Sequence, residues 1–203
     1  MNRESIGSAC GSRRLKGFAP YLAMLLGALI LVVSLLLPFG SARKSLRDAL
    51  SASPDTIYDE KLNMTCADAM DISLVEFARI FGSAGDIGSI FSMAAIIAVG
   101  VFALLTLLFA ALKKPVPAIV FTLLAFGALL LVLKDFDLRG SFSTGSSYKL
   151  GCACWFMFVG IAAEMFGSIW MLVERAKLKK LHTVDGGSGE ISDNAADESE
   201  EGK

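Results

Sequence analysis

Glu164 is the only acidic or basic side chain that lies well inside one of the long apolar runs of this 203-residue chain. A carboxylate at mid-membrane depth costs about 2.5 kcal/mol or more, so such a group normally faces other helices or water. Counting along the runs puts Thr106 and Thr122 at a similar depth, where their hydroxyl groups could donate to the carboxyl group. Because no basic residue is available inside a run, we expect Glu164 to be protonated or reached by water.

Two interpretations of this group stay open. Glu164, Thr106 and Thr122 could form a proton- or cation-responsive site of a small transporter or channel component. Alternatively, Glu164 is a neutral, hydrogen-bonded acid that holds helices together. Replacing Glu164 by Gln preserves the shape of the side chain, so only the first interpretation predicts loss of an ion- or pH-dependent activity.

Small residues surround Glu164 in the sequence. Gly160, Ala163 and Gly167 lie three or four positions from one another, on the helical face that carries the carboxyl group. Small side chains allow a second helix to approach closely. We therefore predict that this face packs against a neighbouring helix.

Three cysteines allow a disulfide to be considered. Cys66 lies in the polar segment 40–88, and Cys152 and Cys154 lie at the start of the last apolar run. The Cys-x-Cys pair cannot easily close on itself, but Cys66 could bridge to either member, or all three could be free thiols. The single histidine, His182, is expected on the opposite side, so no zinc site forms.

Known catalytic and nucleotide-binding motifs are absent from the sequence. We therefore predict no enzymatic activity, no catalytic residues, no cofactor and no metal. Nucleic-acid binding is equally unsupported, because the basic residues are few and adjoin the apolar runs.

Four apolar runs must position these side chains. With 54% apolar residues the chain is too apolar for an ordinary soluble domain. Each run is long enough for a helix that crosses about 30 Å of hydrocarbon. The sequence predicts an all-α membrane protein, an up-down-up-down bundle of four transmembrane helices in a membrane domain of residues 17–180. The predicted spans are 17–39, 89–112, 116–133 and 150–173.

Basic residues indicate the orientation of this bundle. They gather in the segment 1–16, in the short link at Lys113 and Lys114, and after the fourth run. Short cytoplasmic segments are enriched in lysine and arginine. We therefore expect both termini in the cytoplasm, the segment 40–88 outside, and the protein in the cell (plasma) membrane.

The second half of the outer segment predicts a short amphipathic helix. Ser73 and Glu76 have the spacing of a capping box. Leu74, Ala78 and Phe81 recur at helical spacing after it. This helix could act as a plug or dock a partner, or it could lie in the membrane interface with its apolar side among the headgroups.

The predicted cytoplasmic segments are polar. The N-terminal segment 1–16 is short and basic, and the tail 181–203 is acidic and rich in glycine and serine. Such composition cannot bury apolar surface, so we expect the tail to be disordered. It could bind a basic partner or be only solvated.

The layout of residues 17–180 resembles small, uncharacterised four-span membrane proteins of bacteria. The resemblance is carried by the Leu-Pro-Phe stop at 37–39, the Ile-Ser-Leu helix start at 72–74, the Lys-Lys hairpin at 113–114 and a glycine-bearing fourth span. The larger first outer loop and smaller second one are similar to claudin-like proteins in loop order only, because the first loop has no Trp and one Cys. These resemblances imply a four-helix membrane bundle and no specific activity.

The interpretation that follows is non-enzymatic. We expect an integral protein that acts as a structural or interaction component of a membrane complex. Its contacts are the lipid bilayer and a protein partner, reached through the outer segment or the acidic tail. The alternative is the transporter or channel component with its site at Glu164.

Overall fold

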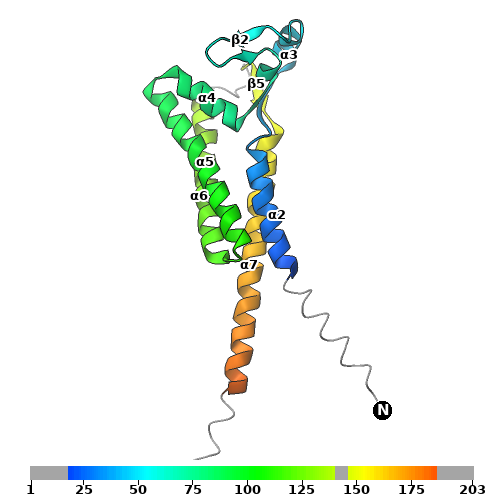
Figure 1. Ribbon diagram of the computed structural model, residues 1–203, viewed down its shortest axis with the longest axis vertical. Helices are drawn as coiled ribbons and strands as arrows, with labels where there is room; N and C mark the ends of the chain where they lie inside the picture. The colour runs from blue at the N-terminus through cyan, green and yellow to red at the C-terminus, as the bar shows by residue number, and fades with distance from the viewer. Residues whose placement is uncertain (1–17, 140–145, 187–203) are drawn as a thin grey trace, which may run out of the picture.

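Four helices lie side by side along the long axis of the molecule, and a smaller folded head covers one end of them (Figure 1). The computed structural model describes residues 18–139 and 146–186, with the side chains of the last helix given as far as Lys177. The helices are α2 (Phe18–Ser34), α5 (Ile87–Ala111), α6 (Pro115–Leu138) and α7 (Cys152–Gly186).

Three of these helices are long and apolar enough to cross a membrane: α5, α6 and the Cys152–Lys177 part of α7. α2 is apolar but has only 17 residues, which gives about 25 Å against about 30 Å of hydrocarbon. It ends early because residues 35–37 form turns, and Pro38 and Phe39 belong to a strand. Helix length therefore supports three of the four predicted spans.

Other predicted boundaries also move. α6 continues to Leu138, beyond the predicted end of the third span. Leu150 belongs to a strand, so α7 starts at Cys152. α7 continues to Gly186, so the first six residues of the predicted disordered tail are helical. The predicted segment 1–16 and the rest of the tail lie outside the described residues.

The helices form a ring in which each packs against two neighbours. α2 packs along α7 and α5 along α6, while contacts between α2 and α5 and between α6 and α7 close the ring. Successive helices run in opposite directions (Figure 1). The interior is mainly apolar, with Leu31, Val99, Leu129 and Met157 among its buried residues. Large apolar side chains also remain exposed along all four helices, as lipid contact requires.

The head contains a three-stranded antiparallel sheet that the sequence did not predict. Its order is β4 (Asp71–Ser73), β1 (Pro38–Ala42) and β5 (Tyr148–Leu150). The expectation of an all-α protein is therefore wrong at these strands. The three segments leave the helix ends side by side, so their backbones can pair. Next to the sheet, the backbone N–H of Gly151 donates to the carbonyl of Phe39 at 2.7 Å.

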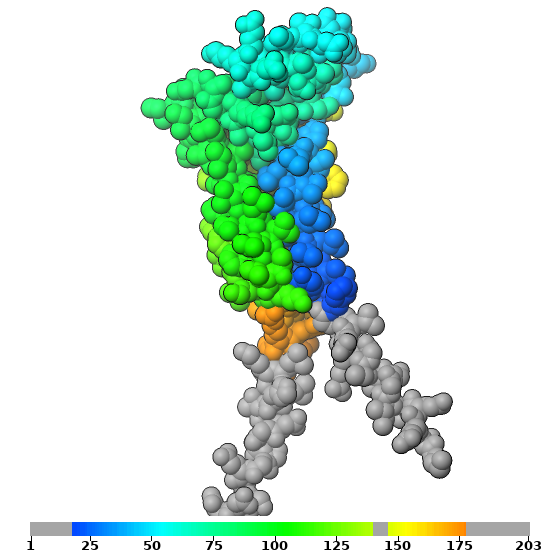
Figure 2. Space-filling view, in the orientation of Figure 1, coloured from blue at the N-terminus to red at the C-terminus, as the bar shows by residue number. Residues whose placement is uncertain are grey.

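The remaining part of the head is small and lies farthest from the helices (Figure 2). It consists of α3 (Lys44–Ser51), the hairpin of β2 (Ile57–Asp59) and β3 (Met64–Thr65), and the short helix η1 (Asp68–Met70). Leu50, Met64 and Ala69 are its buried centre. We use "head" below for residues 38–84 and 146–151.

The predicted amphipathic helix is α4 (Leu74–Ala84), and its capping box is confirmed. The Glu76 carboxylate accepts from the Ser73 N–H at 2.7 Å, and the Ser73 hydroxyl accepts from the Glu76 N–H at 3.3 Å. Leu74 is buried, and Ala78 and Phe81 pack against the bundle core. The apolar side of α4 therefore covers the end of the bundle, and its placement among the headgroups stays a prediction.

Candidate functional site

Glu164 lies in the interior of the bundle and is fully buried. The hydroxyl of Ser168, one helical turn later on α7, donates to Glu164 Oε1 at 2.6 Å, and Ser168 is also fully buried. Residues four positions apart on a helix face the same way. Ser168 was missed in the sequence analysis, although its spacing from Glu164 was a signal that could have found it.

Two further hydroxyl groups come from the neighbouring helices. Thr122 on α6 donates to the carbonyl of Ala118 at 3.0 Å, and its Oγ1 lies 3.4 Å from Oγ1 of Thr106 on α5. The Thr122 hydroxyl also interacts with the Glu164 carboxyl group. Both threonines are fully buried. The structure thus brings together the three residues that depth along the sequence had grouped.

One oxygen of this cluster is not satisfied. Glu164 Oε2 has no hydrogen-bond partner, and it is the only such buried side-chain oxygen or nitrogen in the part of the chain that the structure describes. An unsatisfied buried polar atom costs about 1–3 kcal/mol. Among the described residues, the Glu164 cluster is therefore the place in the bundle interior where a buried polar atom lacks a hydrogen bond.

Close packing of α2 against α7 fixes the position of Glu164. A Cβ at Gly27 of α2 would collide with backbone atoms of Glu164 and Gly160, and one at Gly167 would collide with the backbone of Met24. The predicted packing at Gly160 and Gly167 is thus present. Ala163 is half-buried. Gly27, the partner on α2, was not predicted.

Of the two alternatives left open for the cysteines, the structure has free thiols: Cys66, Cys152 and Cys154 are all free. Cys66 packs at the small core of the head, whereas Cys154 is buried in the bundle core and Cys152 is exposed. The thiols therefore belong to separate parts of the molecule, and Cys66 forms no bridge to α7.

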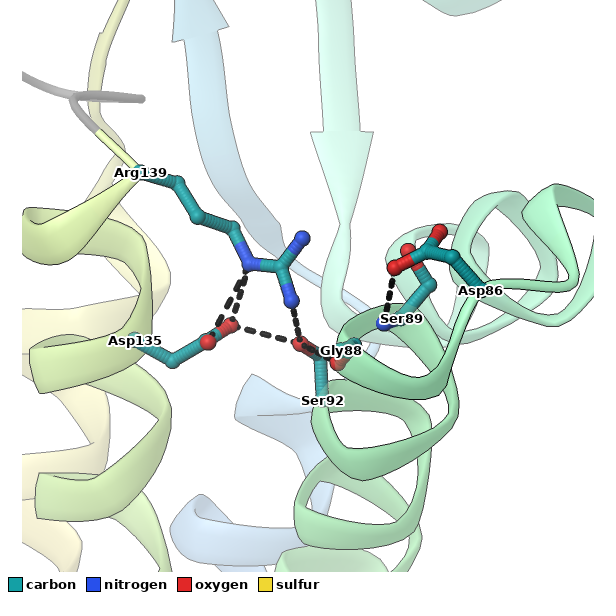
Figure 3. A network of polar contacts seen from close by, with 6 residues as sticks. All are labelled: Asp86, Gly88, Ser89, Ser92, Asp135 and Arg139. Atoms are coloured by element: carbon teal, nitrogen blue, oxygen red, sulfur yellow. Dashed lines mark hydrogen bonds and ion pairs between the residues drawn. The ribbon is translucent and has the colours of Figure 1, made fainter.

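A polar network joins α5 and α6 at the head end of the bundle (Figure 3). Arg139 Nε donates to both carboxylate oxygens of Asp135, at 3.1 and 3.0 Å. Ser92 lies between them: its hydroxyl donates to Asp135 at 2.6 Å, and it accepts from Arg139 Nη2 at 2.9 Å. The Asp135 side chain is only 16% exposed, whereas the Arg139 side chain is 31% exposed, so the network lies at the edge of the bundle with its arginine open to solvent.

The same figure shows how α5 begins beside the network. Asp86 is the N-cap of α5 and accepts from the backbone N–H of Ser89 at 2.9 Å. Hydrogen bonds from the side chain and the backbone of Ser89 hold the pKa of Asp86 below its ordinary value. The cap fixes the start of α5 where α4 ends, with Gly85 in the left-handed conformation at φ 75°.

Beneath the network, four phenylalanine rings connect the head to the bundle. Phe77 of α4 lies 4.9 Å from Phe136 of α6 and 6.4 Å from Phe39 of β1 between ring centroids. Phe81 lies 5.7 Å from Phe136, and the Arg139 guanidinium lies 5.3 Å above the Phe81 ring. Aromatic pairs at such distances add to the stabilisation from burial. The head is therefore packed onto the bundle by both apolar and polar contacts.

Tyr148 of β5 connects the two outer parts of the chain. Its hydroxyl donates to the carbonyl of Ala69 at 2.8 Å. Burial, together with the neighbouring Tyr58 hydroxyl, raises the pKa of Tyr148 to about 12. The backbone N–H of Arg43 also donates to the carbonyl of Ser147 at 2.8 Å.

Exposed apolar residues mark the β2 hairpin. Ile57 is 54% exposed and Tyr58 is 51% exposed. Their strand, β2, lies at the end of the head that is farthest from the bundle (Figure 1). Exposed Asp55 and Glu60 and half-buried Asp59 surround them. An apolar centre with a polar rim is typical of protein interaction surfaces.

The opposite end of the bundle, which we call the hairpin end, carries basic residues. Lys113 has a φ of 56° in the turn between α5 and α6. Its ammonium group lies 4.9 Å from the centre of the Tyr21 ring, and Arg175 donates to its carbonyl at 2.7 Å. These contacts hold α2, the turn and α7 together.

Cavities bounded by the described residues include two that lie away from the Glu164 cluster. One of about 180 Å³ in the head is lined by Leu62, Asn63, Met64, Asp68, Glu76 and Arg79. The other, an apolar groove of about 370 Å³, lies between α5 and α6 and includes Phe91, Phe102 and Gly127. Glu164 lines neither. Among the described residues no three His, Cys, Asp or Glu side chains gather as metal ligands do.

Comparison with protein-family models, curated proteins and solved structures gave no match to this chain. The resemblance to four-span bacterial membrane proteins therefore stays a prediction.

Proposed function

We propose that this protein is a multi-pass protein of the cell (plasma) membrane that acts without catalysis, by binding a protein partner through its head. The observation that carries this proposal is the attachment of the head: its Phe39, Phe77 and Phe81 rings pack against Phe136 of α6, and the Arg139 guanidinium lies over the Phe81 ring. A surface held in place loses less conformational freedom when a partner binds.

In this proposal all four helices cross the membrane, and the turns after α2 complete its shorter span. The head lies outside the cell and both termini lie in the cytoplasm. The support is the charge at the hairpin end, where Lys113, Lys114 and Arg175 gather next to apolar helices. Such residues favour the cytoplasmic side.

The proposed contact surface is the β2 hairpin with Ile57 at its centre. Aromatic and apolar residues are enriched in the centres of protein interfaces, and charges lie at the rim. The acidic neighbours Asp55 and Glu60 favour a partner that presents basic groups around an apolar pocket. The acidic residues after Gly186 are proposed as a second contact for a basic partner.

The test is site-specific photocrosslinking in native membranes. A photoreactive amino acid at Ile57 should give one discrete adduct, because this position lies at the centre of the proposed contact surface. The control is Ala49, which is also exposed and in the head but lies on α3. Ile57→Asp should abolish recovery of the same partner, and Ala49→Asp should preserve it. Equal adducts from both positions, or equal recovery with both variants, would contradict the proposal.

A further inference from the structure

The Glu164 cluster gathers more oxygen atoms than a structural hydrogen bond needs. Both carboxyl oxygens, the hydroxyls of Ser168, Thr122 and Thr106, and the Ala118 carbonyl come from α5, α6 and α7. A neutral carboxylic acid has one O–H donor, and both of its oxygens can accept, but Ser168 uses only one of the two oxygens. Oε2 remains without a hydrogen-bond partner.

Among the residues that the structure describes, no opposite charge lies near this group. α2 and α5 contain no acidic or basic residue, and those of α6 lie at its head end, in Lys134, Asp135 and Asp137. On α7 the nearest charged residue is Glu174, ten positions and about 15 Å away. The other titratable side chains on these helices are Tyr21, at the hairpin end against Lys113, Cys152 and Cys154, near the start of α7, and His182, 18 positions after Glu164 in the last turns of α7. A negative charge on Glu164 must therefore be balanced within the cluster itself.

The chemistry of the oxygens selects what can balance the charge. Carboxylate, hydroxyl and carbonyl oxygens are ligands for hard cations. A single carboxylate supplies one negative charge, so one monovalent cation makes the buried site neutral, whereas a divalent ion would leave a net charge in an apolar interior. A proton on Glu164 achieves the same neutrality.

We propose that Glu164, with Ser168, Thr122 and Thr106, forms a binding site for one monovalent cation, at which Na⁺ and a proton compete. Entry of Na⁺ releases the proton from the carboxyl group, so the net charge of the site stays the same. Oε2 then coordinates the ion. This inference does not depend on a partner for the head, and it requires no transport across the membrane.

The test uses the full-length protein purified in lipid nanodiscs. Adding NaCl to weakly buffered protein should release about one proton per molecule, because the ion can bind only the deprotonated site. Choline chloride at the same ionic strength should release none. The melting temperature should rise with the logarithm of Na⁺ concentration, as expected for a ligand of the folded state.

Variants separate the site from general salt effects. Glu164→Gln should lose both the proton release and the Na⁺-dependent rise in melting temperature. Glu174→Gln, on the same helix but outside the cluster, should retain both. Thr122→Val and Ser168→Ala remove one ligand each with little change of volume, and each should weaken the Na⁺ response at least about tenfold, corresponding to about 1.4 kcal/mol.

The outcomes are distinct. If the folded wild-type protein responds identically to NaCl and choline chloride, the inference is overturned and Glu164 is a structural acid. A Na⁺ response that survives in Glu164→Gln overturns it as well. If Glu164→Gln does not fold, an unchanged response in both Thr122→Val and Ser168→Ala has the same consequence. A failed photocrosslink at Ile57 would leave this site unaffected.

Discussion

Tyr148 joins separate parts of the head through one side chain and its own backbone. Its hydroxyl reaches the carbonyl of Ala69, while its carbonyl accepts from Arg43 Nε at 3.3 Å and from the Ser146 hydroxyl at 2.7 Å. The phenol is half-buried beside Tyr58. Loss of the proton would place a charge in this packed position and remove the donor to Ala69.

The first prediction concerns the pH dependence of Tyr148. Its pKa rises from 10.0 to about 12 on folding, so its protonated form contributes stability that is complete below pH 10 and is lost as the pH rises through about 12. Tyr148→Phe should lower the melting temperature at pH 8 and flatten its decline between pH 10 and 12. Thermal unfolding across this range is the measurement, and an equally steep decline in both proteins would contradict it.

Ser73 supports the second prediction. Its hydroxyl and backbone form both halves of the cap of α4. Ser73→Ala should destabilise α4 by about 1 kcal/mol, the usual cost of a lost N-cap. Hydrogen exchange of the α4 amides measures this effect. Ser83, exposed near the end of the same helix, offers Ser83→Ala as the control, which should leave the amides of the first turn unchanged.

The sequence predicted the surroundings of some single residues and not of others. Counting positions along the apolar runs predicted that Glu164, Thr106 and Thr122 lie together. This works because helices that run side by side through the same layer have the same rise per residue, so equal counts from one end give equal depths. The sequence left the cysteines open between a bridge and free thiols, because spacing says nothing about which core a residue joins. Cys66 packs in the head and Cys154 in the bundle.

At the scale of whole helices, the α2–α7 contact depends on glycine at close approach. A Cβ at Gly27 would meet the backbone of Glu164, which cannot rotate away as a side chain can. Backbones this close maximise van der Waals contact where lipid and core are equally apolar. The contact also holds Glu164 in place from the side opposite its carboxyl partners.

A third prediction compares two glycines in apolar helices. Gly27→Ala should destabilise the protein by about 1–3 kcal/mol, as overpacking does. Gly127→Ala should be neutral or stabilising by up to about 1 kcal/mol, because nothing lies within 4 Å of its added methyl group. Denaturant unfolding in detergent micelles measures both. Equal loss in the two variants would refute the close approach of α2 and α7.

Elements formed by local signals were predicted, and elements formed by distant pairing were not. The apolar runs predicted the long helices, and the capping box predicted the start of α4. The sheet was missed because β1 pairs with β4 about 30 residues away and with β5 more than 100 residues away. Gly40, Ser41 and Ala42 have low strand propensity, so only tertiary pairing makes them a strand.

At the scale of the whole molecule, the proposed orientation leads to the fourth prediction. In a variant whose native cysteines are serine, Ser53→Cys in the head should react with a membrane-impermeant thiol reagent on intact cells. Ser199→Cys in the acidic tail should react only after permeabilisation. The reason is that, in the proposed orientation, the basic residues of the hairpin end lie in the cytoplasm. The reverse labelling pattern would invert the orientation and place the head inside.

α7 continues well past the turn that joins α5 and α6 (Figure 1). From Arg175, which donates to the carbonyl of that turn, to Gly186 is a rise of about 16 Å. Electrostatic forces in physiological salt decay over about 8 Å. The end of α7 at Gly186 therefore lies about two screening lengths beyond the lysines of the turn. At this separation the charges of the turn exert little electrostatic force on a group bound at the far end of α7, so the two ends of this helical extension can carry charges of opposite sign independently.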